Sequence, residues 1–151
     1  MVKFEDIKEE ADKWAQEYCE AINNNKDYEE AAKDWGIDQE GAMEYVLEAQ
    51  GEVEEDVRVF LDLKGGKCLG TKVLRPGEEP PREPILSISA PMLTWRKVAF
   101  LEIDPITGLM QNKLKLEGDM RLAMRYSKAA VELANSVENT DRTILTKYKL
   151  E

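Results

Sequence analysis

The chain has 151 residues, of which 42% are hydrophobic and 34% are charged, so it has enough apolar residues for the core of one folded domain. Its formal net charge of −10 argues against a general nucleic-acid binder, because neutralising phosphates takes an excess of Lys and Arg. The charge is uneven, since residues 1–56 carry 19 acidic and 5 basic side chains (net −14) and residues 57–151 carry 12 and 16 (net +4). The acidic part is interpreted as a solvated surface, with a docking surface for a basic partner as the alternative.

The chain begins with a helical pattern. Apolar residues over 3–23 recur at intervals of three and four, which predicts one amphipathic helix. The Asn run 23–25 is expected to end it, because Asn side chains compete for backbone hydrogen bonds. Asp27 and Glu30 then have the spacing of a capping box, which predicts a short helix ending at Gly36.

A further helix is predicted over residues 39–50. Asp38 is suited to cap its N-terminus, and Gly51 is suited to end it. With this element, residues 1–52 are expected to be a helical N-terminal part.

The spacing of the apolar residues changes after residue 56. Apolar and polar residues alternate over 57–64, which is the two-residue repeat of a strand. The Gly65-Gly66 pair predicts a tight hairpin turn, followed by a returning strand over 67–75. Four prolines in the segment 76–84 predict an exposed loop, because proline cannot donate ladder hydrogen bonds.

The second half mixes strands and helices. A strand is predicted over 85–90, and a helix follows from Pro91 to the turn at Asp104-Pro105 and Gly108. A strand is predicted over 112–117, and Asp119 is expected to cap a last long helix that reaches Val137. This order of elements predicts an α+β fold.

The last predicted helix is apolar or small over most of its circumference. Its polar residues form one narrow stripe: Arg121, Arg125, Lys128, Glu132 and Asn135. A helix with so wide an apolar arc is either a central core helix or the wall of an apolar cavity. The methionines of this half suit an adaptable apolar surface and equally suit gaps in a core.

The segment from Asp104 to Tyr126, DPITGLMQNKLKLEGDMRLAMRY, resembles the signature of the sterol carrier protein domain family. The strand pattern REPILSISAP, the helix after it and the preceding hairpin follow the family's order, so the resemblance covers about residues 53–137. It implies a mixed β-sheet with helices packed on it around an apolar cavity that takes up fatty acyl chains, sterols or similar lipids. The chain is then expected to be a single domain over 1–151, with a family core at 53–137, a helical N-terminal extension at 1–52 and a C-terminal tail at 138–151.

We expect such a domain to bind or carry a fatty acid, a fatty acyl-CoA or a sterol-like molecule without catalysis. Eight residues on facing strand and helix positions are the expected cavity walls: Phe60, Trp95, Phe100, Met110, Leu114, Leu116, Met120 and Met124. The alternative is an accessory subunit with a filled cavity that docks a partner protein through its acidic N-terminal helices. A homodimer is a further possibility for the partner.

The head group of a bound lipid is a separate question. Arg96 and Lys97 lie on the helix after Pro91, and Arg121 and Arg125 recur along one edge of the last helix. If the cavity opens beside that edge, Arg121 and Arg125 are possible contacts for an anionic head group. The other interpretation is a solvated helix face.

Residue types that support catalysis are scarce. The chain has no histidine, which removes the commonest general base and metal ligand, so we expect no enzyme activity, no cofactor and no metal. Cys19 and Cys68 are far apart and form no CxxC pair, which predicts neither a disulfide framework nor a thiolate site and favours a reducing cytoplasm. No transmembrane segment or signal peptide is expected.

Overall fold

The computed structural model describes residues 1–151 and begins with two helices that are separated by Asn24 and Asn25. α1 (Phe4–Asn23) follows Lys3, whose backbone N–H donates to the Asp6 carboxylate at 2.9 Å. α2 (Lys26–Ala31) begins after Asn25, whose side chain accepts from the Tyr28 N–H at 3.0 Å. The predicted first helix is confirmed, whereas the second is shorter than expected and is capped by Asn25 rather than by Asp27.

The predicted helix over residues 39–50 is wrong. Met43–Glu48 forms β1, the middle strand of a five-stranded sheet with the order β3-β2-β1-β4-β5. β1 pairs antiparallel with β2 (Val57–Lys64) and parallel with β4 (Leu86–Pro91). Met, Leu and Glu favour helices in isolation, but ladders on both sides outweigh that local preference.

The predicted hairpin is confirmed. β2 pairs antiparallel with β3 (Lys67–Leu74), and the two are joined by Gly65 and Gly66, which have φ angles of +61° and +81°. Both angles lie in the left-handed region that glycine enters without a steric penalty. β5 (Lys115–Gly118) adds antiparallel to β4, three residues later than the strand predicted from Asn112.

The helices after β4 are shorter than predicted. α3 (Met92–Ala99) ends before Leu101, whose φ of 62° reverses the chain. The Asp104-Pro105 pair then begins α4 (Pro105–Met110) instead of ending a helix, because the Asp104 carboxylate accepts from the Thr107 N–H at 2.9 Å.

The last predicted helix is interrupted. α5 (Met120–Arg125) and α6 (Ser127–Ser136) meet at Tyr126, whose φ of −105° and ψ of 31° break the helical repeat. The ring of Tyr126 packs edge-on against Trp35 at 4.9 Å between centroids, a tertiary contact that local periodicity does not predict. A 3₁₀ turn, η1 (Val137–Asn139), and the one-turn α7 (Thr143–Thr146) follow.

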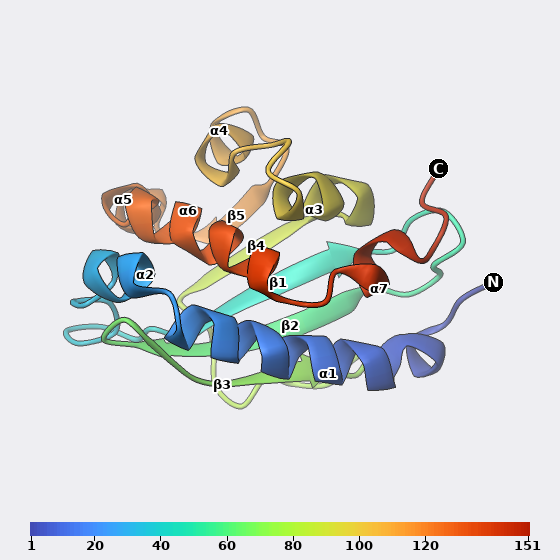
Figure 1. Ribbon diagram of the computed structural model, residues 1–151, viewed down its shortest axis with the longest axis horizontal. Coiled ribbons are helices and arrows are strands. Elements are labelled where there is room, and N and C mark those ends of the chain that lie inside the picture. Colours follow the sequence, from blue (N-terminus) through green and yellow to red (C-terminus); the bar gives the residue numbers. More distant parts are fainter.

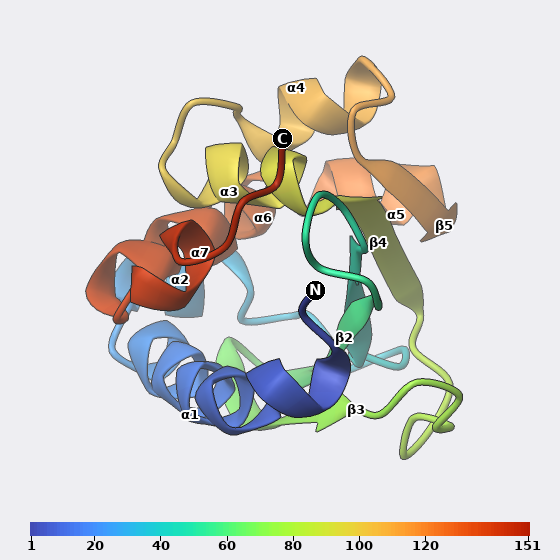
Figure 2. The same cartoon turned by 90° about the vertical axis from the view of Figure 1, so that its right-hand side faces the viewer.

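The curved sheet and the helices enclose the core (Figures 1 and 2). In Figure 2 the strands occupy the lower and right-hand sides, from β3 beside α1 to β5, and the helices close the left and upper sides. The mixed α+β fold predicted from the sequence is thereby confirmed. None of the helices combines the length and the apolar character needed to cross a bilayer.

A disulfide joins Cys19 of α1 to Cys68 of β3 across 49 residues of sequence. This corrects the expectation that Cys19 and Cys68 indicate no disulfide framework. The pairing depends on α1 lying along β3, where Thr71 Oγ1 also donates to the Ala15 carbonyl at 2.9 Å. The cysteines therefore give no support to a reducing cytoplasm, and the compartment stays a prediction.

Candidate functional site

An apolar cavity of about 150 Å³ lies between the sheet and the helices. Of its 27 lining residues, 25 are hydrophobic. The lining comes from α1, β1, β2, β4, α3, α4, α6 and the last residues of the chain, so the complete tertiary fold forms it.

The sheet wall follows from the two-residue repeat of strands. Alternate side chains of β1, β2 and β4 point to the same face, and six of them line the cavity: Met43, Tyr45, Leu47, Val57, Val59 and Ile88. The alternation predicted for residues 57–64 therefore marks the correct face of β2.

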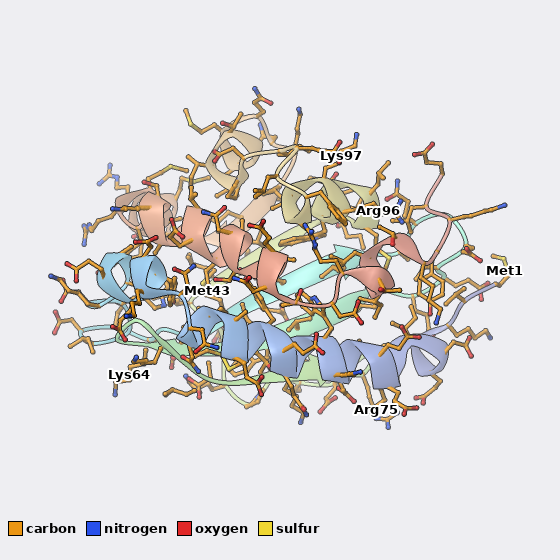
Figure 3. The ribbon with its side chains drawn as sticks, viewed as in Figure 1. Met1, Met43, Lys64, Arg75, Arg96 and Lys97 are labelled. Atoms are coloured by element: carbon orange, nitrogen blue, oxygen red, sulfur yellow. A yellow bond between two sulfur atoms is a disulfide. The ribbon has the colours of Figure 1, made fainter.

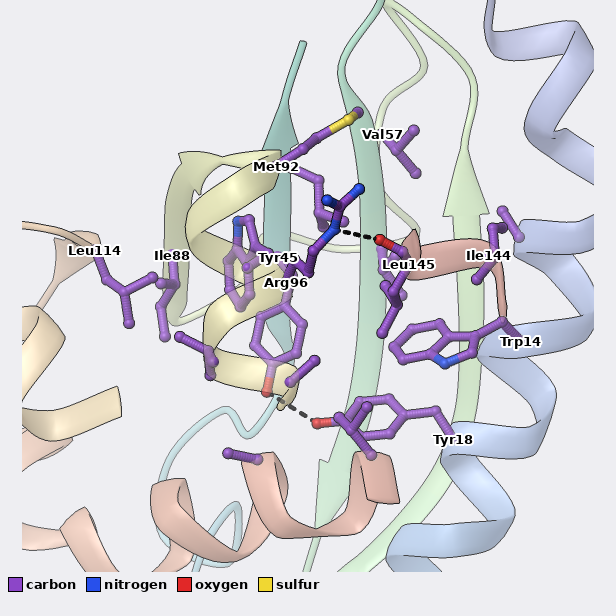
Figure 4. Close-up of a pocket in the computed structure, with 18 of the residues that line it drawn as sticks. Trp14, Tyr18, Tyr45, Val57, Ile88, Met92, Arg96, Leu114, Ile144 and Leu145 are labelled. Atoms are coloured by element: carbon purple, nitrogen blue, oxygen red, sulfur yellow. Dashed lines mark hydrogen bonds between the residues drawn. The ribbon is translucent and has the colours of Figure 1, made fainter. Parts of the chain in front are cut away.

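The helix walls follow from the helical repeat. α1 contributes residues separated by four, three and four positions: Ile7, Ala11, Trp14 and Tyr18. α6 contributes Leu133 and two alanines, Ala130 and Ala134, and the small side chains of the alanines leave room in the cavity. Figure 4 shows Trp14 and Tyr18 facing Tyr45 and Arg96 across this space.

The buried Tyr18 and the partly buried Tyr45 bring two hydroxyl groups together in the cavity lining. Tyr18 Oη donates to the Leu133 carbonyl at 2.9 Å and lies 3.3 Å from Tyr45 Oη, so Tyr45 is the donor between the two (Figure 4). Burial raises the pKa of Tyr45 to about 12, and burial followed by the neighbouring Tyr45 raises the pKa of Tyr18 well above its ordinary value. Both phenols are therefore neutral near pH 7 and are not poised as bases.

Arg96 is the one charged side chain in the lining. Its Nε donates to the Leu145 carbonyl at 2.6 Å, and its Nη2 donates to the Tyr148 carbonyl at 2.8 Å. Figure 4 shows Arg96 extending from α3 toward Leu145, whereas the neighbouring Lys97 lies at the outer surface (Figure 3). The end of the chain thus closes over the cavity beside this guanidinium.

Two of the eight expected wall residues line the cavity, Trp95 and Leu114. Trp95 is held by a hydrogen bond from its Nε1 to the Val46 carbonyl at 2.9 Å. Leu114 is buried against α4 and α6, in a cluster that includes Leu109 and Ala134.

The two expected phenylalanines lie elsewhere. Phe60 alternates with Val57 and Val59 along β2, so its side chain points to the other face of the sheet. There the Arg82 guanidinium lies 5.6 Å from the centroid of the Phe60 ring. Phe100 ends α3, and the Arg142 guanidinium stacks 4.4 Å above its ring. Neither ring belongs to the cavity lining.

The remaining expected wall residues come from α4, β5 and α5. Met110 and Met120 are exposed, with 72% and 43% of their surface accessible. Leu116 and Met124 are partly buried beside the cavity without lining it. Met110 lies on α4 before the left-handed residue Asn112 (φ 59°), whereas Met120 and Met124 lie on α5, so these methionines belong to two separate helices.

Arg121 and Arg125, the predicted head-group contacts, are exposed on α5 and are absent from the cavity lining. The sequence interpretation also missed β1 and the C-terminal residues as parts of the wall. The alternation of Met43, Tyr45 and Leu47 with Glu44 and Glu48, interrupted only by Val46, is the signal that could have revealed β1 as a strand.

Comparison with known proteins gives one family. The model of the SCP-2 sterol transfer family matches residues 4–131, which includes α1 as well as the segment that carries the sequence resemblance. Among proteins with curated descriptions, none matches the chain significantly.

Solved structures agree with this family. A crystal structure of sterol carrier protein 2 is 28% identical with a TM-score of 0.73, and the match covers 86% of this chain and 97% of that chain. A conserved protein of Thermus thermophilus, described as possibly a sterol carrier protein, is 30% identical with a TM-score of 0.72, and the match covers 85% and 87%. The sterol carrier protein domain 2 of Helicoverpa armigera, at 17% identity and a TM-score of 0.57, covers 82% and 87% and shares the fold. The chain therefore belongs to the SCP-2 sterol transfer family.

Proposed function

We propose that this protein binds a lipid-like apolar ligand in its cavity and carries it without covalent chemistry. The observation that carries this proposal is the cavity itself, in which 25 of 27 lining residues are hydrophobic. Transfer of an alkyl chain from water into such surroundings is worth about 0.8 kcal/mol for each CH₂ group. Two similar solved structures are described as a sterol carrier protein and as possibly one, and a lipid-like ligand is consistent with those descriptions.

The chemistry of the lining supports binding rather than catalysis. The chain contains no histidine, and the hydroxyl groups of the lining belong to Tyr18, Tyr45 and Tyr148. Tyr18 and Tyr45 hydrogen-bond to each other, and burial raises the pKa of both. No nucleophile paired with a base faces the cavity.

A binding experiment with the delipidated full-length chain tests this proposal. We expect a fluorescent fatty-acid probe to bind at micromolar concentration and to be displaced by unlabelled fatty acid, fatty acyl-CoA or sterol, the three proposed ligand classes. The order of displacement would rank these classes. Absence of binding by fatty-acid, sterol and other lipid probes would refute the proposal.

The alternative role, docking of a partner protein through the acidic N-terminal helices, makes a different prediction. Several acidic residues of α1 and α2 already pair with cations of the same chain: Glu5 with Arg75, Glu10 with Lys147, and Glu29 with Lys67. This internal pairing favours a carrier over a docking subunit. Native mass spectrometry of the purified protein distinguishes the two, since a carrier is expected to retain lipid and a docking subunit is not.

A further inference from the structure

Arg96 differs from three other arginines of this protein in the groups that accept its hydrogen bonds. Arg58, Arg75 and Arg82 each pair with a carboxylate, whereas both hydrogen bonds of Arg96 go to neutral backbone carbonyls. Arg96 is also the one charged residue of an otherwise apolar lining. A partly buried guanidinium without a counter-ion is suited to a carboxylate, which accepts two charge-assisted hydrogen bonds.

The two carbonyls belong to a segment that we call the C-terminal strap, residues 140–151. The strap supplies four lining residues: Ile144, Leu145, Tyr148 and Leu150. It lies outside residues 4–131, the part of the chain that the family model matches. Part of the cavity wall therefore comes from outside the segment that the family model matches.

The strap is held without a covalent cross-link, by hydrogen bonds along its length, by the Lys147–Glu10 ion pair and by the packing of the buried Leu150. Trp14 Nε1 donates to Thr140 Oγ1 at 3.0 Å, and the Glu52 N–H donates to the Lys149 carbonyl at 2.9 Å. Between these bonds, α7 has one turn, which is too short to be stable as an isolated helix. The free energy of local unfolding is lowest for segments of this kind, which have little regular secondary structure and no covalent cross-link.

The cavity volume requires a movement before a long ligand enters. A cavity of about 150 Å³ holds a molecule the size of benzene, whereas pockets for larger ligands measure roughly 300–1,000 Å³. The neighbouring wall, α1, is fixed to β3 by the Cys19–Cys68 disulfide. The strap has no covalent cross-link and its one regular element is the single turn of α7, so it is the part of the wall best suited to move.

We propose that Arg96 binds the carboxylate of an alkyl-chain ligand, and that this carboxylate displaces the strap by replacing the Leu145 and Tyr148 carbonyls on the guanidinium. The proposal rests on the proposed function of the cavity. Binding of the head group and opening of the wall then become one event, because the same guanidinium either holds the strap closed or holds the ligand. A neutral lipid of equal chain length has no carboxylate, so it cannot replace the two carbonyls on the guanidinium in this way.

The first experiment compares dodecanoic acid with dodecanol as displacing ligands, in the wild type and in Arg96→Gln. We expect the wild type to prefer the acid by roughly 10- to 100-fold, the range for a charge-assisted hydrogen-bonded pair. In Arg96→Gln the two affinities should become equal within about threefold. Arg96→Lys, which keeps the charge and loses the bidentate geometry, should retain part of the preference.

The matched control is Arg121→Gln/Arg125→Gln, which removes two exposed cations outside the cavity lining. It should leave the preference for the acid unchanged. Equal affinities of acid and alcohol for the wild type, or an unchanged preference in Arg96→Gln, would refute the role of Arg96 while leaving lipid binding intact. Failure of both ligands to bind the wild type would instead refute the proposed function.

The second experiment measures hydrogen exchange of the strap amides and needs no variant that alters Arg96. In the wild type, dodecanoic acid should accelerate exchange at residues 144–150 at least about tenfold, and dodecanol at equal occupancy should do so less. Slower exchange with the acid than with the alcohol would refute displacement of the strap. Because this measurement uses the wild type, it still tests the proposal if Arg96→Gln does not fold.

Gly51 offers a variant that loosens the strap without touching Arg96. Its φ is +59°, and a Cβ atom built on it would lie 2.3 Å from the Lys149 carbonyl oxygen. Gly51→Ala should therefore accelerate exchange of the strap without any lipid and should keep the preference for acid over alcohol. Loss of that preference in Gly51→Ala would show that it depends on closure of the strap rather than on Arg96.

Discussion

Glu40 holds the 76–84 loop against the outer face of the sheet. Its Oε2 accepts from Arg82 Nε at 2.9 Å, and its Oε1 accepts from the N–H groups of Gly41 and Ala42, each at 2.9 Å. The hydrogen bond from Arg82, followed by that from the Ala42 N–H, lowers the pKa of Glu40 from 4.5 to about 2. Because Asp62 accepts from the same guanidinium at 2.7 Å, Arg82 joins the loop to β2 over Phe60.

This arrangement predicts a pH-dependent stability difference for Glu40→Gln. A pKa that is lower in the folded state stabilises the fold above pH 4.5, and this contribution is lost as the pH falls toward about 2. The side chains of Arg82 and Glu40 are 41% and 37% exposed, so the difference at pH 7 should not exceed about 1 kcal/mol. Urea unfolding from pH 7 to pH 2 measures it, with Glu79→Gln in the same loop as the control. A difference that does not change with pH would contradict the prediction.

At the scale of elements, the contact of α1 with β3 is held by a covalent bond and by side-chain hydrogen bonds. Beside the Cys19–Cys68 disulfide, Asn23 at the end of α1 donates to the Cys68 carbonyl at 2.9 Å and accepts from the Cys68 N–H at 2.8 Å. An Asn from the run that was expected only to end the helix thus also fixes its position on the sheet.

Breaking the disulfide should destabilise the protein substantially. We expect Cys19→Ala to lower the free energy of unfolding by about 2–4 kcal/mol, because the bond closes a loop of 49 residues in the unfolded chain. Cys19→Ala/Cys68→Ala should lose about the same amount, and so should the wild type under reducing conditions. Guanidinium unfolding with and without a thiol reductant measures these values. Two free thiols in the untreated, unfolded wild type would show that the bond does not form.

The elements that could be predicted from the sequence are those with local determinants. The period of α1, the glycine turn between β2 and β3 and the proline-rich loop all lie within short segments. β1 was missed because its strand conformation depends on β2 and β4, which follow it in the chain. The predicted alternation of β2 already put Phe60 on the opposite face to Val59, and the structure places Val59 and not Phe60 in the lining.

At the scale of the whole molecule, the cavity exists because small residues of α6 face large residues of the sheet. Ala130 and Ala134 approach the strands that carry Met43 and Tyr45, and this juxtaposition joins residues about 90 positions apart, which is beyond the reach of local patterns. The strap could not be predicted either, because residues 138–151 have neither a long repeat nor the family pattern.

Filling the cavity from α6 should therefore block the ligand. We expect Ala134→Met to weaken binding of a fluorescent fatty-acid probe about tenfold, since its side chain takes the place of roughly two CH₂ groups of the ligand. Lys128→Met, the same residue on the exposed face of α6, is the matched control and should bind as the wild type does. Thermal unfolding checks that both variants fold. Unchanged binding by Ala134→Met would place the ligand outside the cavity.

The Cys19–Cys68 disulfide has a consequence for the kinetics of ligand exchange. It fixes α1 to β3, so one wall of the cavity is covalently joined to the sheet, while the strap beside that wall is held by noncovalent contacts alone. Under the proposed opening of the strap, ligand passes in and out on that side of the molecule only. Residence time is then set by the strap, whereas the shape of the bound chain is set by the rigid wall, so rate and selectivity can change independently through mutation of different segments.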